Sequence, residues 1–254
     1  MQIDAHPLRP DAAGPLKGPL DPVDPAFLKS LAEHVHDRLR KAIIAGRFRP
    51  EQRLNERQLA AELGVSTTPL KEALRRLESE GLVRIEARRG VYVTFTAAQA
   101  EEMALARAAL ESMIARLAAR RVTPSQCAAL QQTVAAMTAA TASGEVEELI
   151  SLNERFHNAI HFASGCIHLR RLLDGQHMYD HAFRVAVLGD AAERRCALDE
   201  HRAIMDALCA RDADRAERAM RDHIVRSGQQ HVESVFQTTP ETAEQTSTKG
   251  EPRQ

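Results

Sequence analysis

Two short amphipathic patterns separated by a tight turn constrain the fold of this chain more than any other feature. The first pattern has one apolar helical face, made of Leu59, Ala60 and Leu63. The second has another such face, made of Leu70, Ala73, Leu74 and Leu77. Because Gly64 is typical of a helix end and Ser66 of a helix start, residues 55–79 predict a helix-turn-helix.

The residues on both sides of this motif complete a small domain. Residues 27–45 have the apolar spacing of one more helix, which Gly46 would end. Residues 82–86 and 91–95 are short strand-like runs joined by a basic turn. We therefore expect a winged helix-turn-helix with a small two-stranded wing over residues 27–95.

This segment is basic although the whole chain is nearly neutral. Residues 28–96 contain 14 basic and nine acidic side chains, whereas residues 97–254 contain 18 basic and 22 acidic ones. Small hydroxyl residues open the second helix of the motif, where short side chains and a helix N-terminus can approach phosphates. The basic residues near that helix and the wing are Arg57, Lys71, Arg88 and Arg89. We expect them to contact DNA, although a solvated basic surface would look similar.

One string in this segment resembles a known family of regulators. LNERQLAAELGVSTTPLKEALRRLESEGLVRIEARRGVYV looks like the winged helix-turn-helix of GntR-type bacterial transcription regulators. The similarity covers residues 30–95 and implies an operator-binding dimer. It also implies that the DNA-contact positions of the family are held by Arg57, Ser66, Thr67, Thr68, Lys71, Arg89 and Gly90.

Two of these positions depart from the usual pattern of the family. Thr67 and Lys71 stand where family members often carry arginine. A guanidinium that grips guanine with two bonds is therefore missing at Thr67, and Lys71 offers only a point charge. The operator sequence accordingly cannot be inferred from the arginine-bearing members.

The rest of the folded chain, residues 96–236, is predicted to be helical. Thr96 with Gln99 forms a capping-box signature for a long helix that extends to about Arg121. Further helices are predicted at residues 123–143, 145–164, 168–188, 190–210 and 212–235. Since the connections are short and no strand pattern appears, we expect an all-α antiparallel helical bundle.

Three of these helices carry a histidine on an apolar face. They are His157, which follows Asn153 by one helical turn, His201 and His223. A single buried histidine is usually a hydrogen-bonded core residue, but three of them with an amide oxygen favour a shared ligand. Neutral imidazoles suit Zn²⁺, Ni²⁺ or a similar divalent metal. The histidines predicted to lie on the surface are His34, His36 and His231.

The helical part also resembles a known domain. The strings NERFHNAIHFASG, DEHRAIMDAL and ARDADRAERAMRDHI look like the ligand-binding domain called FCD, found in the FadR-type branch of the GntR family. The resemblance implies a metal site in which Asn153, His157, His201 and His223 are the ligands. Metal-binding members carry Asp or Asn at the first position, and the neutral Asn153 predicts weaker metal binding than Asp would give.

Arg107 lies on an inward-facing stripe of the first long helix. Its guanidinium could bind a carboxylate with two hydrogen bonds, and the family carries arginine here and responds mostly to small organic acids. A helix pair between Arg107 and Glu111 explains the same pattern equally well. We therefore expect either effector binding or a structural ion pair at Arg107.

Several other classes of protein are disfavoured. No run approaches the roughly 18–20 apolar residues of a membrane helix, and residues 1–25 have no signal-peptide core. The four cysteines form no CxxC pair, so we expect a reducing cytoplasmic location. Residues 1–26 and 237–254 are poor in core residues and are predicted to be disordered tails.

Taken together, these patterns predict a metabolite-responsive transcription regulator, expected to be a repressor. A homodimer would bind a palindromic double-stranded operator, and a small carboxylate would enter the helical domain. A helical-bundle metalloenzyme is the main alternative, but no HExxH or ExxH pair is present. Glu154 and Glu200 are predicted to point away from the candidate metal ligands. A DNA-binding protein without an effector is the third possibility.

Overall fold

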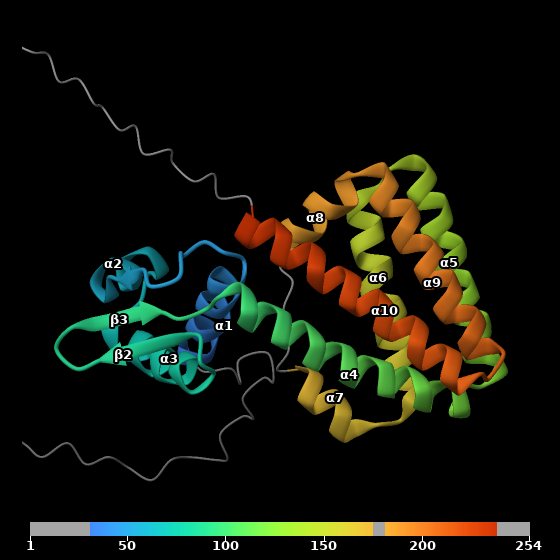
Figure 1. Cartoon of the computed structure of the whole chain (residues 1–254), viewed down its shortest axis with the longest axis horizontal. Helices are drawn as coiled ribbons and strands as arrows, with labels where there is room; N and C mark the ends of the chain where they lie inside the picture. The colour runs from blue at the N-terminus through green and yellow to red at the C-terminus, as the bar shows by residue number, and fades with distance from the viewer. Residues whose placement is uncertain (1–30, 175–180, 238–254) are drawn as a thin grey trace, which may run out of the picture.

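A computed structural model describes residues 31–174 and 181–237 of the chain. The predicted tails lie outside these ranges, apart from Gln237. Within the described residues the fold is mainly helical, with one small sheet near the N-terminal side (Figure 1). The predicted fold class is therefore confirmed: a winged helix-turn-helix is followed by an all-α bundle.

The winged helix-turn-helix consists of three helices and a small sheet. The helices are α1 (Leu31–Ile44), α2 (Glu56–Leu63) and α3 (Thr67–Ser79). The strands are β1 (Arg53–Leu54), β2 (Val83–Glu86) and β3 (Gly90–Val93), in the antiparallel order β1-β3-β2. The sequence predicted only the last two strands, because a strand of two residues is too short to show an alternating pattern.

Local signals at the helix-turn-helix act largely as predicted. The Asn55 side chain accepts hydrogen bonds from the backbone N–H groups of Arg57 and Gln58, and Gly64 ends α2 in the left-handed conformation. Ser66 occupies the N-cap position of α3, but its hydroxyl makes no capping hydrogen bond. The helix is fixed instead by its apolar face, because Leu70, Leu74 and Leu77 are almost completely buried.

The second part of the chain contains seven α-helices among the described residues. They are α4 (Ala97–Arg121), α5 (Pro124–Ser143), α6 (Val146–Ser164), α7 (Ile167–Asp174), α8 (His181–Gly189), α9 (Ala191–Cys209) and α10 (Ala213–Val232). Capping boxes open α4 at Thr96 and α5 at Thr123. The helix predicted over residues 168–188 includes α7, up to Asp174, and α8, from His181, and its middle lies outside the described residues.

Helix α10 connects the two parts of the molecule. It runs back along α4 toward the helix-turn-helix (Figure 1), and its last residue, Val232, belongs to the apolar core formed by α1, α2, α3 and the sheet. The Phe236 ring, in the π-helical turn η2 (Glu233–Gln237), lies 5.7 Å from that of Phe95. The end of α10 is thus packed into the first domain.

His231 was predicted to lie on the surface, and this prediction is wrong. The side chain is completely buried, and its Nε2 lies 3.2 Å from the backbone oxygen of Ile44, at the end of α1. The pattern of α10 alone could not show this, because His231 is covered by the end of α1, which is 187 residues away in sequence. His34 is exposed and His36 is partly buried against Glu80.

Gly46 offers a test of how tightly η2, the turn after α10, packs against the first domain. Gly46 has φ +73°, and an added Cβ would lie 2.6 Å from Cγ1 of Val235, whereas Gly64 has φ +65° and open space around it. Gly64→Ala should lower the free energy of unfolding by about 1–2 kcal/mol from backbone strain alone. Gly46→Ala should lower it by about 1–3 kcal/mol more, because the methyl group is overpacked against Val235.

Urea denaturation of the two variants measures this difference. Val235→Ala removes the atoms that the new methyl group meets, so it should bring the cost of Gly46→Ala close to that of Gly64→Ala. Equal decreases in the free energy of unfolding for Gly46→Ala and Gly64→Ala would show that Gly46 and Val235 are not in close contact.

Candidate functional site

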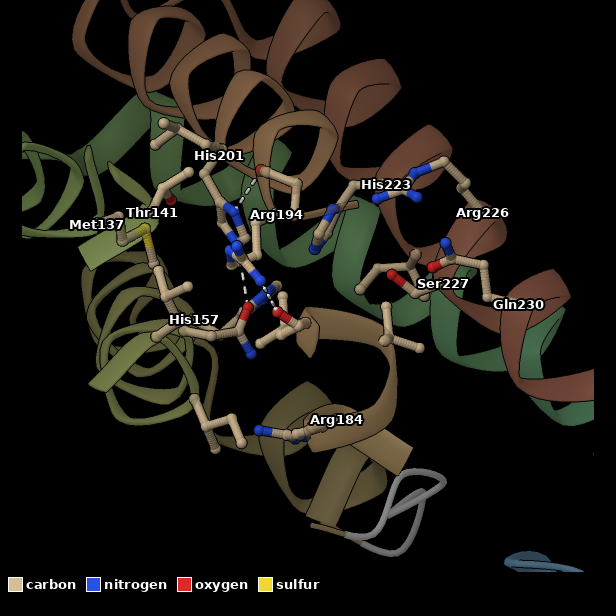
Figure 2. A pocket seen from close by; sticks show the side chains of 18 of the residues that line it. Met137, Thr141, His157, Arg184, Arg194, His201, His223, Arg226, Ser227 and Gln230 are labelled. Atoms are coloured by element: carbon tan, nitrogen blue, oxygen red, sulfur yellow. Dashed lines mark hydrogen bonds between the residues drawn. The ribbon is translucent and has the colours of Figure 1, made fainter. Parts of the chain in front are cut away.

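A pocket of about 100 Å³ lies inside the helical part of the chain. Its wall is formed by side chains from α4, α5, α6, α8, α9 and α10. Figure 2 shows His157, His201 and His223 pointing toward one another across it. Arg107 and Asn153 also line the pocket. The structure thus brings together all five residues that the sequence singled out in this part of the chain.

The three histidines form a compact buried cluster. One ring nitrogen from each residue lies within 4.8 Å of one nitrogen of the other two. The ring centroids of His157 and His223 are 5.4 Å apart, and those of His201 and His223 are 4.7 Å apart. Three converging imidazoles on three different helices are the donor set that divalent metals such as Zn²⁺ accept.

Hydrogen bonds fix which nitrogen of two of these rings faces the cluster. The Nδ1 atom of His201 donates to the carbonyl oxygen of Ala197 at 2.6 Å, and that of His223 donates to a carboxylate oxygen of Glu200 at 2.7 Å. Both acceptors can only accept, so each Nδ1 carries a proton, and in the neutral ring each Nε2 presents a lone pair. This arrangement, with the outer nitrogen bonded to a carbonyl or carboxylate, is usual for histidines that bind metals.

Asn153 meets His201 in a way that also suits a cation. The Nε2 atom of His201 lies 3.0 Å from Oδ1 of Asn153, and in the neutral ring both atoms offer lone pairs. A metal ion held by both would remove the repulsion, as would a 180° turn of the Asn153 amide. The buried Nδ1 of His157 has no hydrogen-bond partner and lies 3.9 Å from Oε2 of Glu111. These residues fit a metal site.

His157 and His201 are held in the neutral form that binds metals. Burial, together with the nearby His223 and His201, lowers the pKa of His157 well below its usual range. Burial and the charge of His223 lower the pKa of His201 to about 3. Protons therefore compete little with a cation for these two rings near neutral pH.

Acid should destabilise the metal-free protein through the same residues. An unfolded histidine takes up its proton near pH 6.5, whereas folded His201 does so only near a pKa of about 3. The unfolded chain therefore binds more protons as the pH falls, so stability that is complete above about pH 6.5 is lost progressively below it. Between pH 7 and pH 5, His201 alone should lower the free energy of unfolding by about 2 kcal/mol.

Urea denaturation of EDTA-treated protein at these two pH values measures the loss. His201→Gln should reduce the pH dependence by the share of His201, about 2 kcal/mol, while the buried His157 keeps its own share. His168→Gln, at an exposed position on α7, should leave the pH dependence intact. Equal unfolding free energies for the wild type at both pH values would contradict the prediction.

The partly buried Glu200 supports the cluster, a role that the sequence analysis missed. Glu200 was predicted to point away, but it bonds His223 and also accepts from the guanidinium of Arg226. Burial alone would raise the pKa of Glu200, yet the bonds from His223 and Arg226 lower it to about 2. Glu154 does point elsewhere and pairs with Arg184. Helical periodicity could not place Glu200, because its partners lie on α10.

Glu111 pairs with Arg107, as one of the two interpretations of Arg107 predicts. The Glu111 carboxylate accepts from Arg107 at 3.2 Å and from Nε2 of His161 at 2.7 Å. Burial would raise the pKa of Glu111, but the bond and charge of His161, with those of Arg107, hold it below its usual value. Arg107 therefore forms the ion pair and still lines the pocket.

The predicted DNA-contact residues lie together on the surface of the first domain. Except for the partly buried Gly90, the members of the predicted set are exposed. Arg57, Thr67, Lys71 and Gly90 border one surface hollow, and Arg88 borders a second hollow that shares Lys71 and Gly90 with the first. Arg89 pairs with Glu86 at 2.9 Å but remains 75% exposed.

Arg53 belongs to both hollows and was not predicted from the sequence. It lies on β1, opposite Tyr92 of β3. A Cβ at Gly90 would come within 2.8 Å of the Arg53 Nε, so the glycine lets this side chain lie against the wing. No local sequence signal indicated this position, because it depends on the pairing of β1 with β3.

Comparisons with known proteins agree with this arrangement. Residues 31–93 match the model for bacterial regulatory proteins of the gntR family, and residues 102–226 match that for the FCD domain. The chain is 30% identical to the uncharacterized HTH-type transcriptional regulator YdhC of Bacillus subtilis over 208 residues, 80% of this chain and 90% of that one. It is 28% identical over 213 residues to the HTH-type transcriptional repressor RspR of Escherichia coli, covering 84% and 92% of the two chains.

A solved structure gives the same result for the fold. The structure of E. coli McbR/YncC superposes with a TM-score of 0.57 at 26% identity, covering 83% of this chain and 99% of that one. YdhC and RspR are both named as transcription regulators. No helix in the described residues is long and apolar enough to cross a membrane.

Proposed function

Because this chain belongs to the GntR family of bacterial transcription regulators and carries an FCD domain, we propose that a small organic acid bound in its helical part controls its binding to DNA. The observation that carries the proposal is the buried pocket in which Arg107 and the cluster of His157, His201 and His223 face one cavity. This family membership removes the metalloenzyme alternative, since the matched relatives are named as regulators.

The metal site is the first part of the proposal. Asn153, His157, His201 and His223 would hold one divalent ion, Zn²⁺ or Ni²⁺, through an amide oxygen and three imidazole nitrogens. The bound ion would supply a positive charge that attracts an effector carboxylate. Arg107, which Glu111 holds at the wall of the pocket, would donate to the same carboxylate.

Helix α10 is the structural path from the pocket to the DNA-binding domain. Arg226, Ser227 and Gln230 line the pocket, while the next two residues, His231 and Val232, contact the first domain. A ligand that moves the first group therefore acts on the second through less than two turns of one helix. By linkage, an effector that favours one position of α10 must change the affinity for DNA.

DNA binding is proposed to involve the exposed residues around α3 and the wing. A homodimer would place two copies of α3 against the two halves of a palindromic operator. We propose that residues 27–95 form the DNA-binding unit and residues 96–236 the effector-binding and dimerisation unit. Repression relieved by the effector is the proposed mode of action in the cytoplasm, and RspR is named as a repressor.

A binding experiment tests the proposal directly. Duplexes selected from a random pool by the full-length protein supply the DNA probe, and fluorescence anisotropy then measures its affinity with and without a panel of small carboxylates. At least one carboxylate should change the dissociation constant for DNA about 10-fold or more. If none changes either DNA affinity or melting temperature, the protein binds DNA without such an effector and the proposal is wrong.

A further inference from the structure

The pocket wall is rich in basic side chains. Four arginines and three histidines line it, and no carboxylate among the described residues does. Three of the arginines nevertheless pair with carboxylates outside the wall: Arg107 with Glu111, Arg184 with Glu154, and Arg226 with Glu200 and Glu193. These three charges are at least partly balanced before any ligand binds.

Arg194 differs from the other three arginines. Its NH1 group donates to the carbonyl oxygens of Leu188 and Gly189, at 2.7 and 2.9 Å, at the end of α8. Its Nε atom is buried and has no hydrogen-bond partner, and no carboxylate in the described part of the chain pairs with it. Asp190, one turn earlier on the same chain, uses its carboxylate to cap α9 through the N–H groups of Ala192 and Glu193. Figure 2 shows the Arg194 side chain among the residues that enclose the cavity.

We propose that Arg194 forms a second anion subsite and that the effector is a short dicarboxylate. This inference rests on the proposed function, because it assigns one carboxylate to Arg107 and the histidine cluster. The other carboxylate would bind the guanidinium of Arg194, which lines the pocket and has no carboxylate within ion-pair distance in the described part of the chain. A monocarboxylate bound at Arg107 and the histidine cluster would leave the Arg194 guanidinium without a carboxylate partner.

The size of the pocket limits the length of such a ligand. Its volume is about 100 Å³, below the ~150 Å³ of a cavity that accommodates benzene. Malonate and succinate are therefore the dicarboxylates to test first, because they are among the smallest.

Calorimetry on the Zn²⁺-loaded full chain tests the assignment. The probes are malonate and succinate, each compared with the monocarboxylate of equal carbon number, propionate or butyrate. Wild type should bind the dicarboxylates at least about 10-fold more tightly. Arg194→Gln should remove that preference while leaving monocarboxylate affinity and metal content unchanged. Arg195→Gln, at the exposed neighbouring position, is the matched control and should keep the preference.

The outcomes separate this inference from the proposed function. If the dicarboxylates bind no more tightly than the monocarboxylates, or if Arg194→Gln weakens both classes equally, the second subsite is wrong and the organic-acid pocket stands. If no carboxylate binds to wild type, the proposed function fails and the inference fails with it. Because Arg194 also holds the end of α8, Arg194→Lys provides a charged variant that should retain part of the preference. Should Arg194→Gln not fold, the wild-type preference and the lysine variant still decide the question.

Discussion

Alanine in place of His157 or His223 should abolish metal binding. The wild type is expected to hold about one Zn²⁺ or Ni²⁺ per chain after loading, and each variant should hold none at the same metal concentration. Each substitution removes one of three buried imidazoles that converge within 4.8 Å. Loss of an inner ligand should weaken binding by at least about 100-fold, since losing an outer-shell partner alone costs about 10–100-fold.

Mass spectrometry of metal in the purified protein measures this effect. His168→Ala, at an exposed histidine on α7, is the control and should keep the metal. Asn153→Asp should bind more tightly than wild type, because it adds a negative charge 3.0 Å from His201. If wild type takes up neither Zn²⁺ nor Ni²⁺, the three histidines either bind the effector directly or fill the core.

Glutamate in place of Lys71 should weaken DNA binding by about 100-fold or more in roughly 0.1 M salt. Lys71 is exposed on α3 and borders both hollows next to the wing. The change removes one positive charge from the proposed interface and adds a negative one facing phosphates. The slope of log affinity against log salt should also fall in magnitude by about one or more for the lost contact.

Anisotropy titrations with the selected duplex at several salt concentrations measure both quantities. Arg170→Glu reverses an exposed charge on α7, away from the helix-turn-helix, and should leave affinity and salt dependence nearly unchanged. Lys71→Arg supplies the forked guanidinium common in the family and should keep binding while altering sequence preference. Equal weakening by Lys71→Glu and Arg170→Glu would mean that only net charge matters and that α3 does not face DNA.

The sequence was informative wherever structure depends on near neighbours along the chain. Apolar spacing predicted the helices, and the buried faces of Asn153, His157 and His223 followed from their positions one to three turns from apolar residues. The meeting of these faces in one pocket could not be derived from periodicity. Three inward-facing histidines with an amide oxygen favoured a shared ligand, the resemblance to the family implied one metal site, and the structure brings the three histidines together.

The positions that the sequence did not predict belong to residues placed by a helix or strand that is distant in sequence. Glu200 reaches the site because α10 passes beside α9, and His231 is buried because the end of α10 meets the end of α1. Arg53 lies in the candidate DNA surface because β1 pairs with β3. The position of each residue depends on packing between segments that are far apart in sequence. The residue pattern within one helix or strand contains no information about such packing.

The short distance along α10 between the pocket and the first domain also restricts how chain length can vary. Gln230 faces the pocket and His231 faces α1, so adjacent residues serve opposite partners. Inserting or deleting one residue here would rotate everything beyond it by about 100° and exchange those faces, although every side chain would still be present. Substitutions can therefore change the pocket end or the α1 end of this part of α10 separately. The number of residues between the two ends must stay the same.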